Sequence, residues 1–196
     1  LKTDDSLVLK QGLKYRHKGN NSKITAILKN EQRHFCAYTE KFLSPTEATE
    51  IEHFDPRLKG TAEDSYYNWY AVIRFSNLRK KSRIDNFLPI IKPEEASGRF
   101  IYIDHTFHPK NPDDIEALNF RDFLRLNHPS LVEDRKNHAA RIKELFKLWA
   151  PDPEEQFFEW LSGQDLSFVT SIEHELPEHA HMIIIPEISL IEDKSS

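Results

Sequence analysis

Two short strand-forming segments and the basic segment that follows them constrain the fold of this 196-residue chain more than any other feature. The first segment, TEIEHF at 49–54, alternates Ile51 with polar neighbours and is followed by Pro56, which is typical of a short strand and its end. The second, WYAVIRFS at 69–76, is rich in the aromatic and β-branched residues that favour strands. The two segments predict two strands joined by a loop.

A short basic helix is expected directly after the second strand. Ser76 is a suitable N-cap for the segment NLRKKSRIDN at 77–86. Cations on such a helix suit contacts with phosphate, although a solvated helix face is the commoner role of a run of this kind. The four candidate nucleic-acid-binding residues are Arg79, Lys80, Lys81 and Arg83.

Composition favours a soluble globular protein. Hydrophobic residues make up 38% of the chain and charged residues 30%, and no apolar run reaches the roughly 18 residues that a membrane span requires. The N-terminal segment has no hydrophobic stretch typical of a secretion signal. A single cysteine, Cys36, excludes an internal disulfide and fits a reducing compartment. We therefore expect a cytoplasmic protein with no membrane partner.

The distribution of charge divides the chain near residue 100. Residues 1–100 hold 18 Lys and Arg against 13 Asp and Glu, a net charge of +5, whereas residues 101–196 hold 9 against 19, a net charge of −10. A basic half joined to an acidic half suggests an anion-binding surface on the first half. Charge splits of this kind are also common in proteins without such a surface.

Helical periodicity predicts most of the remaining structure. The segment SKITAILKNEQ at 22–32 predicts a helix with Ser22 as its N-cap. Apolar residues at three- and four-residue spacing predict helices at 115–127 and at 129–150. A further helix is indicated by the residues expected at its start and just past its end, which are Asp152, Pro153 and Gly163.

The second half also contains strand signals. RFIYID at 99–104 predicts a strand, TFHPKNPDD at 106–114 predicts a proline-rich loop, and the segment at 166–189 is expected to contribute strands. The predicted fold class is therefore α+β. The expected organisation is a helical lead-in, a core around the two strands and a mainly helical acidic region, at 1–35, 36–100 and 101–196.

Glu52 and His53, adjacent at the end of the first strand, are the candidate catalytic pair. Hydrolysis of a phosphodiester needs a general base for the attacking water and positive charge for the leaving oxygen. A neutral histidine is a good base near neutral pH, and a carboxylate is a ligand that Mg²⁺ prefers. The dipeptide alone is weak evidence, because it occurs by chance in many proteins.

Two asparagines strengthen this interpretation. Asn68 lies fifteen residues after His53, just before the second strand, where it could hold the backbone or the imidazole in register. Asn77 lies nine residues further, at the start of the basic helix. Because an asparagine carbonyl is a neutral oxygen ligand, Glu52 and Asn77 together would leave room on a metal ion for phosphate and water.

The segment CAYTEKFLSPTEATEIEHFDPRLKGTAEDSYYNWYAVIRFSNLRKKSR at 36–83 resembles the HNH endonucleases, which are built on the ββα-metal fold. It is most similar to the HNH subunits of bacterial anti-phage systems of the Septu and retron-associated type, which operate beside an ATPase. Those subunits carry a CAYC start, an acidic-Ile-acidic-His-Phe strand end, a Tyr-x-Asn-Trp middle and a Cys-x-x-Cys-Asn at the helix start. The segment at 126–145 also looks like their helical C-terminal part.

The resemblance implies roles for four residues: Glu52 and Asn77 as metal ligands, His53 as general base and Asn68 as the middle asparagine. It implies Mg²⁺ or Mn²⁺ as the cofactor, and an ATPase partner docked on the acidic helical region. The expected activity is cleavage of nucleic acid as the effector of an anti-phage complex. Double-stranded DNA is favoured as substrate, but RNA stays open, because phosphate contacts alone do not sense the 2′-hydroxyl.

The chain departs from that group at the structural zinc. Related proteins bind zinc through two Cys-x-x-Cys pairs, and the matching positions here are Cys36 and Thr39, then Ile73 and Ser76. Three of the four thiolates are absent, so no structural zinc is expected. Apolar packing would have to replace it, by Phe35, Tyr38, Trp69, Ile73 and Phe75. The alternative function is therefore a catalytically degenerate HNH-fold subunit that serves in binding and assembly.

The other histidine clusters do not make a comparable case. A zinc-protease helix places two histidines four residues apart with a glutamate between them, whereas His174 and His179 in HELPEH are five apart and are separated by Pro177. The segment with Asp104, His105 and His108 is more often an ordinary loop than a metal site.

Overall fold

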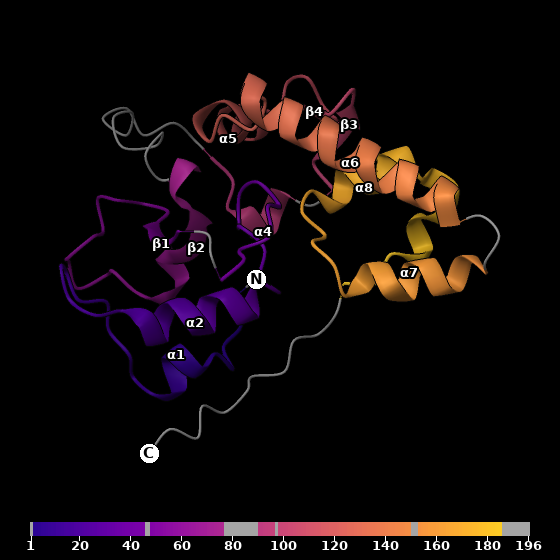
Figure 1. The fold of residues 1–196 in the computed structure, drawn as a ribbon. Helices are drawn as coiled ribbons and strands as arrows, with labels where there is room; N and C mark the ends of the chain where they lie inside the picture. The colour runs from indigo at the N-terminus through magenta and orange to yellow at the C-terminus, as the bar shows by residue number, and fades with distance from the viewer. Residues whose placement is uncertain (1, 46–47, 77–89, 97, 150–152, 186–196) are drawn as a thin grey trace, which may run out of the picture.

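The computed structural model describes residues 2–45, 48–76, 90–96, 98–149 and 153–185 (Figure 1). Over these residues the chain mixes helices with two separate two-stranded antiparallel sheets, so the predicted α+β class is confirmed. Five predicted site residues lie outside the described residues, namely Asn77, Arg79, Lys80, Lys81 and Arg83.

The two expected strands are present in the first half of the chain and pair as a β-hairpin. Strand β1 (Thr49–His53) pairs with β2 (Trp69–Ile73) in antiparallel register. The 3₁₀ helix η1 (Tyr66–Asn68) leads directly into β2, and residues 74–76 turn into a helix directly after it. The described residues therefore have the predicted order of strand, loop, strand and start of a helix.

Strand β2 is the centre of the larger hydrophobic core. Each of its five residues is at most 3% exposed, and the uninterrupted apolar sequence WYAVI fits a strand that is covered on both faces. Helix α2 (Ser22–Glu31) lies along the hairpin (Figure 1). It is preceded by the short helix α1 (Leu7–Lys10). The N-cap of α2 is Asn21 rather than the predicted Ser22, which is the first helical residue.

A turn at 35–42, which contains Cys36, packs against β2. The Cys36 N–H donates to the Lys41 carbonyl at 2.8 Å, and the Ala37 N–H donates to the Ala71 carbonyl at 3.2 Å. The residues predicted to replace the zinc divide between two cores: Tyr38, Trp69, Ile73 and Phe75 belong to or pack against the larger one, and Phe35 packs against the smaller one.

The second hairpin corrects the expected loop at 106–114. Helix α4 (Pro93–Ala96) precedes β3 (Phe100–Ile103), which pairs with β4 (Thr106–Pro109). Strand β4 also receives side-chain support, because the Asn127 carboxamide accepts from the Phe107 N–H at 2.8 Å and donates to its carbonyl at 2.9 Å. The pairing partner β3 directly precedes β4, and Asn127 lies 20 residues after Phe107. The local proline signal revealed neither.

Four α-helices build the C-terminal region: α5 (Ile115–Phe123), α6 (Pro129–Trp149), α7 (Glu154–Ser162) and α8 (Val169–Glu175). The first three were predicted, and α5 ends at Phe123 rather than at residue 127. Pro153 is the N-cap of α7 rather than its first residue, and Asp152 lies outside the described residues. The smaller core forms between α6, α7 and α8, from Ile142, Phe157, Phe158, Leu161, Leu166, Ile172 and Leu176.

The strands predicted at 166–189 are wrong over the described part of that segment. Residues 169–182 instead form α8 and the 3₁₀ helix η2 (Pro177–Met182). Phe168, Ile172 and Leu176 recur every four residues, and none of them is more than 6% exposed. Ile172 lies within α8, whereas Phe168 and Leu176 flank the helix at its two ends. The packing of α8 against α6 overrides the strand preference of valine and isoleucine.

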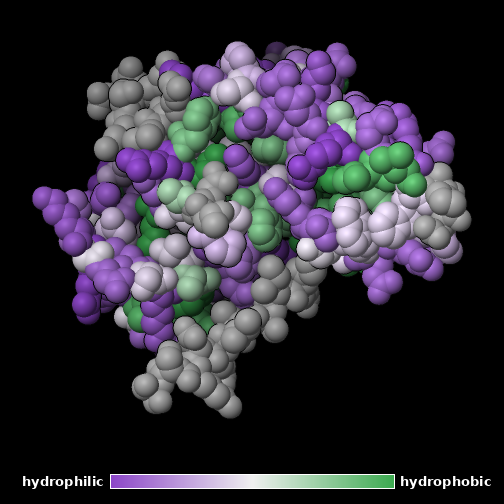
Figure 2. Space-filling model, in the orientation of Figure 1, coloured by the Kyte–Doolittle hydropathy of each residue, from purple (hydrophilic) through white to green (hydrophobic). Residues whose placement is uncertain are grey.

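The surface is mostly hydrophilic in the view of Figure 2. A hydrophobic patch lies over the C-terminal end of α6 in that view, where Leu148 is 78% exposed. In the part of the chain that the structure describes, no helix combines the length and the apolar character needed to cross a membrane.

Candidate active site

Glu52 and His53 lie at the end of β1 and are only 5% and 3% exposed. Adjacent residues of a strand point to opposite faces, and their surroundings differ accordingly. The charge of Glu52 adds to burial in raising the pKa of Tyr38 well above its usual value. The chain bends directly after His53. The side chains of Glu52 and His53 therefore lie on opposite faces of the hairpin, close to its end.

The imidazole of His53 is enclosed by one carboxylate and two aromatic rings. Its Nε2 lies 3.1 Å from Oδ2 of Asp64, which belongs to the loop between β1 and β2. The Tyr15 ring packs edge-on against it at 4.5 Å between centroids, and the Trp69 ring lies at 6.4 Å. An imidazole beside a carboxylate is fixed in orientation.

Asp64 connects the loop to the strand ends. Its Oδ1 accepts from the Trp69 indole N–H at 2.7 Å and from the Asn68 carboxamide at 3.2 Å. Its Oδ2 accepts from the Gly60 N–H at 3.3 Å, in addition to the contact with His53. Nothing in the sequence singled out Asp64, because an aspartate in a polar loop has no pattern that marks such contacts.

Asn68 extends the strand pairing by one step. Its side-chain oxygen accepts from the Asp55 N–H at 2.7 Å, and its NH₂ donates to the Asp55 carbonyl at 3.0 Å. The Phe54 N–H donates to the Asn68 backbone carbonyl at 2.8 Å. Of the two roles considered for Asn68, the structure therefore has it holding the backbone, whereas Asp64 is the residue at the imidazole.

We predict that Asp64→Ala lowers the free energy of unfolding by about 2–3 kcal/mol, because the Trp69 indole N–H and the Asn68 carboxamide lose their acceptor and the His53 ring loses the carboxylate beside it. Urea denaturation followed by tryptophan fluorescence measures the change. Glu63→Ala, at the exposed neighbouring position, is the matched control and is expected to change the value by less than about 0.5 kcal/mol. Equal midpoints for the two variants would contradict the connecting role of Asp64.

The carboxylate chemistry and buried position of Glu52 fit a hard divalent cation such as Mg²⁺ or Mn²⁺. The second predicted ligand, Asn77, follows the described residues directly after Ser76. Within the described ranges, no group of three or more His, Cys, Asp or Glu residues could hold a metal ion. The predicted metal site has only two protein ligands, Glu52 and Asn77, and is therefore smaller than a group of three such residues.

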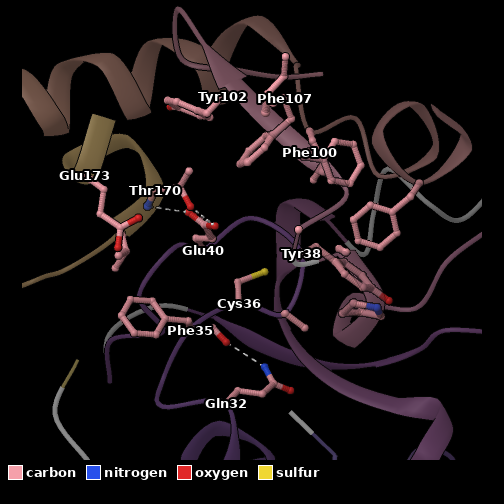
Figure 3. A pocket seen from close by; sticks show the side chains of 18 of the residues that line it. Gln32, Phe35, Cys36, Tyr38, Glu40, Phe100, Tyr102, Phe107, Thr170 and Glu173 are labelled. Atoms are coloured by element: carbon pink, nitrogen blue, oxygen red, sulfur yellow. Dashed lines mark hydrogen bonds between the residues drawn. The ribbon is translucent and has the colours of Figure 1, made fainter. Parts of the chain in front are cut away.

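A cavity of about 610 Å³ lies between the 35–42 turn, the β3–β4 hairpin and α8 (Figure 3). Across it, the Glu40 carboxylate accepts from the Thr170 hydroxyl at 2.7 Å and from its N–H at 3.2 Å. Burial, and then the charge of Glu40, raise the pKa of Glu173. Most of the other lining is apolar and aromatic, including Phe100, Tyr102 and Phe107. This cavity marks the junction between the hairpin region and the C-terminal helices.

Three of the predicted site residues therefore gather at one end of the hairpin, namely Glu52, His53 and Asn68. The predicted ligand Asn77 and the four predicted phosphate-binding cations lie outside the described residues. Comparison of the chain with protein-family models, with curated proteins and with solved structures finds no match.

Proposed function

We propose that this chain is a metal-dependent endonuclease of the HNH type, with a ββα-metal core, that hydrolyses phosphodiester bonds of nucleic acid. The observation that carries the proposal is the buried His53 imidazole at the end of β1, with Nε2 3.1 Å from Asp64. A histidine oriented by a carboxylate suits a general base. The order of strand, loop, strand and start of a helix supports the same interpretation.

In the proposed reaction His53 takes the proton from the attacking water. With Nε2 facing Asp64, the proton of the neutral ring is favoured at Nε2, and Nδ1 is left to accept. Asn68 keeps the loop ends together, so that Asp64 stays against the ring. Glu52 and Asn77 would hold Mg²⁺ or Mn²⁺, which when bound supplies positive charge to the phosphate and to the leaving oxygen.

The proposed substrate is double-stranded DNA, contacted by the basic segment with Arg79, Lys80, Lys81 and Arg83. The positive net charge of residues 1–100 supports an anionic substrate. The proposed setting is an anti-phage complex, in which the acidic region at 101–196 docks an ATPase that controls cleavage. The hydrophobic patch at the end of α6 supports a partner on that region.

A specific observation favours the alternative of a non-catalytic HNH-fold subunit. The His53 side chain is 3% exposed, and the carboxylate at its Nε2 is itself buried. A base that is enclosed in this way reaches water only when the loop carrying Asp64 separates from the ring. A purely structural ion pair would have the same geometry, so the choice between the two functions depends on activity.

The test is cleavage of supercoiled plasmid and of structured RNA by the chain, alone and with its ATPase partner. We expect cleavage that needs Mg²⁺ or Mn²⁺ and stops with EDTA. Glu52→Gln is expected to cut about 10²-fold more slowly at limiting metal, because it loses the charged ligand, and to recover in part as Mn²⁺ is raised.

Glu50→Gln is the matched control for that variant. Glu50 lies two residues earlier on β1, its side chain is 34% exposed, and one of its oxygens is 3.7 Å from Arg74 Nε. We expect this variant to cut at the wild-type rate. If wild-type chain and Glu52→Gln cut equally at every metal concentration, or if neither cuts, the nuclease proposal fails and the assembly role remains.

A further inference from the structure

A cavity of about 860 Å³ opens beside the proposed general base. It lies between the loop that connects β1 to β2 and the segment after α1. Two of its lining residues, Tyr15 and Asp64, are the ones that contact the His53 ring most closely. A group bound in this cavity therefore lies one side chain away from the imidazole.

Two lysines are among the residues that line this cavity. Lys14, His17 and Lys59 line it and are exposed. Lys14 and His17 belong to residues 6–30, which contain six Lys and Arg and no Asp or Glu. No ion pair involves Lys14 or Lys59 among the described residues, whereas Arg57 in the same loop is paired with Asp55 at 2.6 Å.

The Asp64 carboxylate, which lines the cavity, is not paired with the two lysines. Asp64 is the one acidic residue among the described residues that line it. Both of its oxygens are already engaged by His53, Gly60, Asn68 and Trp69. An ionised carboxylate that is satisfied by donors within the protein has little remaining capacity to hold the lysines. The two lysines therefore outnumber the one acidic side chain in the described lining of the cavity, which suits an anion.

The two lysines reach this cavity from separate parts of the chain. Lys59 precedes Gly60, whose φ of +81° is a conformation that glycine adopts without strain. The ammonium of Lys59 lies 5.5 Å from the centre of the Tyr15 ring, within reach of a cation–π contact. The Tyr15 ring thus contacts both the Lys59 ammonium and the His53 ring. Lys14 directly precedes Tyr15 in the sequence.

We propose that this cavity binds a backbone phosphate of the nucleic-acid substrate through Lys14 and Lys59, and that it sets the position of the strand relative to His53. The inference rests on the proposed function, because it names a substrate contact of the same site. It adds a binding element that is separate from the basic segment at 79–83. Contacts with phosphate give affinity and position without sequence preference.

The test is binding of a fluorescein-labelled DNA duplex in EDTA, measured by fluorescence anisotropy over a range of salt concentrations. The variant is the double change Lys14→Gln and Lys59→Gln, and the control is Lys136→Gln, an exposed position on α6. We expect the double variant to bind about tenfold more weakly and its salt slope to fall by about two, one for each lost phosphate contact. The control is expected to match wild type.

The outcomes separate this inference from the proposed function. Wild-type affinity and salt slope in the double variant, or no binding by the wild-type chain, would overturn the phosphate site. Loss of binding in the double variant supports it, even when the wild-type chain does not cleave, and in that case only the nuclease proposal fails. Circular dichroism of the double variant should match wild type, because both lysines are exposed.

Discussion

Replacing His53 by alanine is expected to slow metal-dependent cleavage by about 10²- to 10⁴-fold, the usual contribution of a general base. The expected cause is loss of the ring whose Nε2 faces Asp64 at 3.1 Å. Free imidazole added to the variant is expected to restore part of the rate, because the change leaves a space beside Asp64. A merely structural histidine would not give this rescue.

His179→Ala is a matched control for that variant. Its Nε2 also lies 3.1 Å from a carboxylate oxygen, that of Glu154, but in the C-terminal region. We expect this protein to cut as wild type does and to ignore imidazole. A folded His53→Ala protein that cuts at the wild-type rate would exclude His53 as the base. His53→Gln retains much of the side-chain volume, so it separates loss of the base from loss of packing at Tyr15.

The two strands of the first hairpin and most helices were predictable because their signals are local. Strand β2 is a run of five apolar residues, and α6 repeats apolar residues at helical spacing over 21 positions. The segment at 166–189 shows where such reasoning fails. Its valine and isoleucines favour strands, yet residues 169–175 form α8, which packs against α6 and buries Ile172. That partner is tertiary information.

The candidate site also combines residues that the sequence marks with residues that only the folded structure brings in. Glu52, His53 and Asn68 were predictable, because chemistry and spacing along a hairpin both mark them. Asp64 was not, because its four contacts come from the folded loop and not from a sequence pattern. The enclosure of the His53 ring was also unpredictable, since it depends on Tyr15, which lies 38 residues earlier in the sequence.

Gln32, at the C-terminal end of α2, takes the place of a neighbouring strand at the edge of β2. It is 4% exposed. Its side-chain oxygen accepts from the Ala71 N–H at 2.8 Å, and its NH₂ donates to the carbonyls of Ala71 at 2.7 Å and Phe35 at 2.8 Å. One carboxamide thus joins α2, the 35–42 turn and the strand opposite Glu52. Because these backbone groups are buried, they have no ready replacement partner in water.

Gln32→Ala is therefore expected to lower the free energy of unfolding by about 3 kcal/mol or more, since it leaves buried backbone groups of β2 and the turn unsatisfied. Urea denaturation measures the effect. Gln164→Ala is the control, because that exposed side chain makes one long contact of 3.5 Å with the Trp160 carbonyl.

Gln32→Glu keeps an acceptor for the Ala71 N–H but brings negative charge to two carbonyls, so we expect it to be no more stable than Gln32→Ala. If Gln32→Ala unfolds at the wild-type midpoint, the carboxamide does not fix β2, and the position of the strand that carries Glu52 and His53 must depend on apolar packing alone.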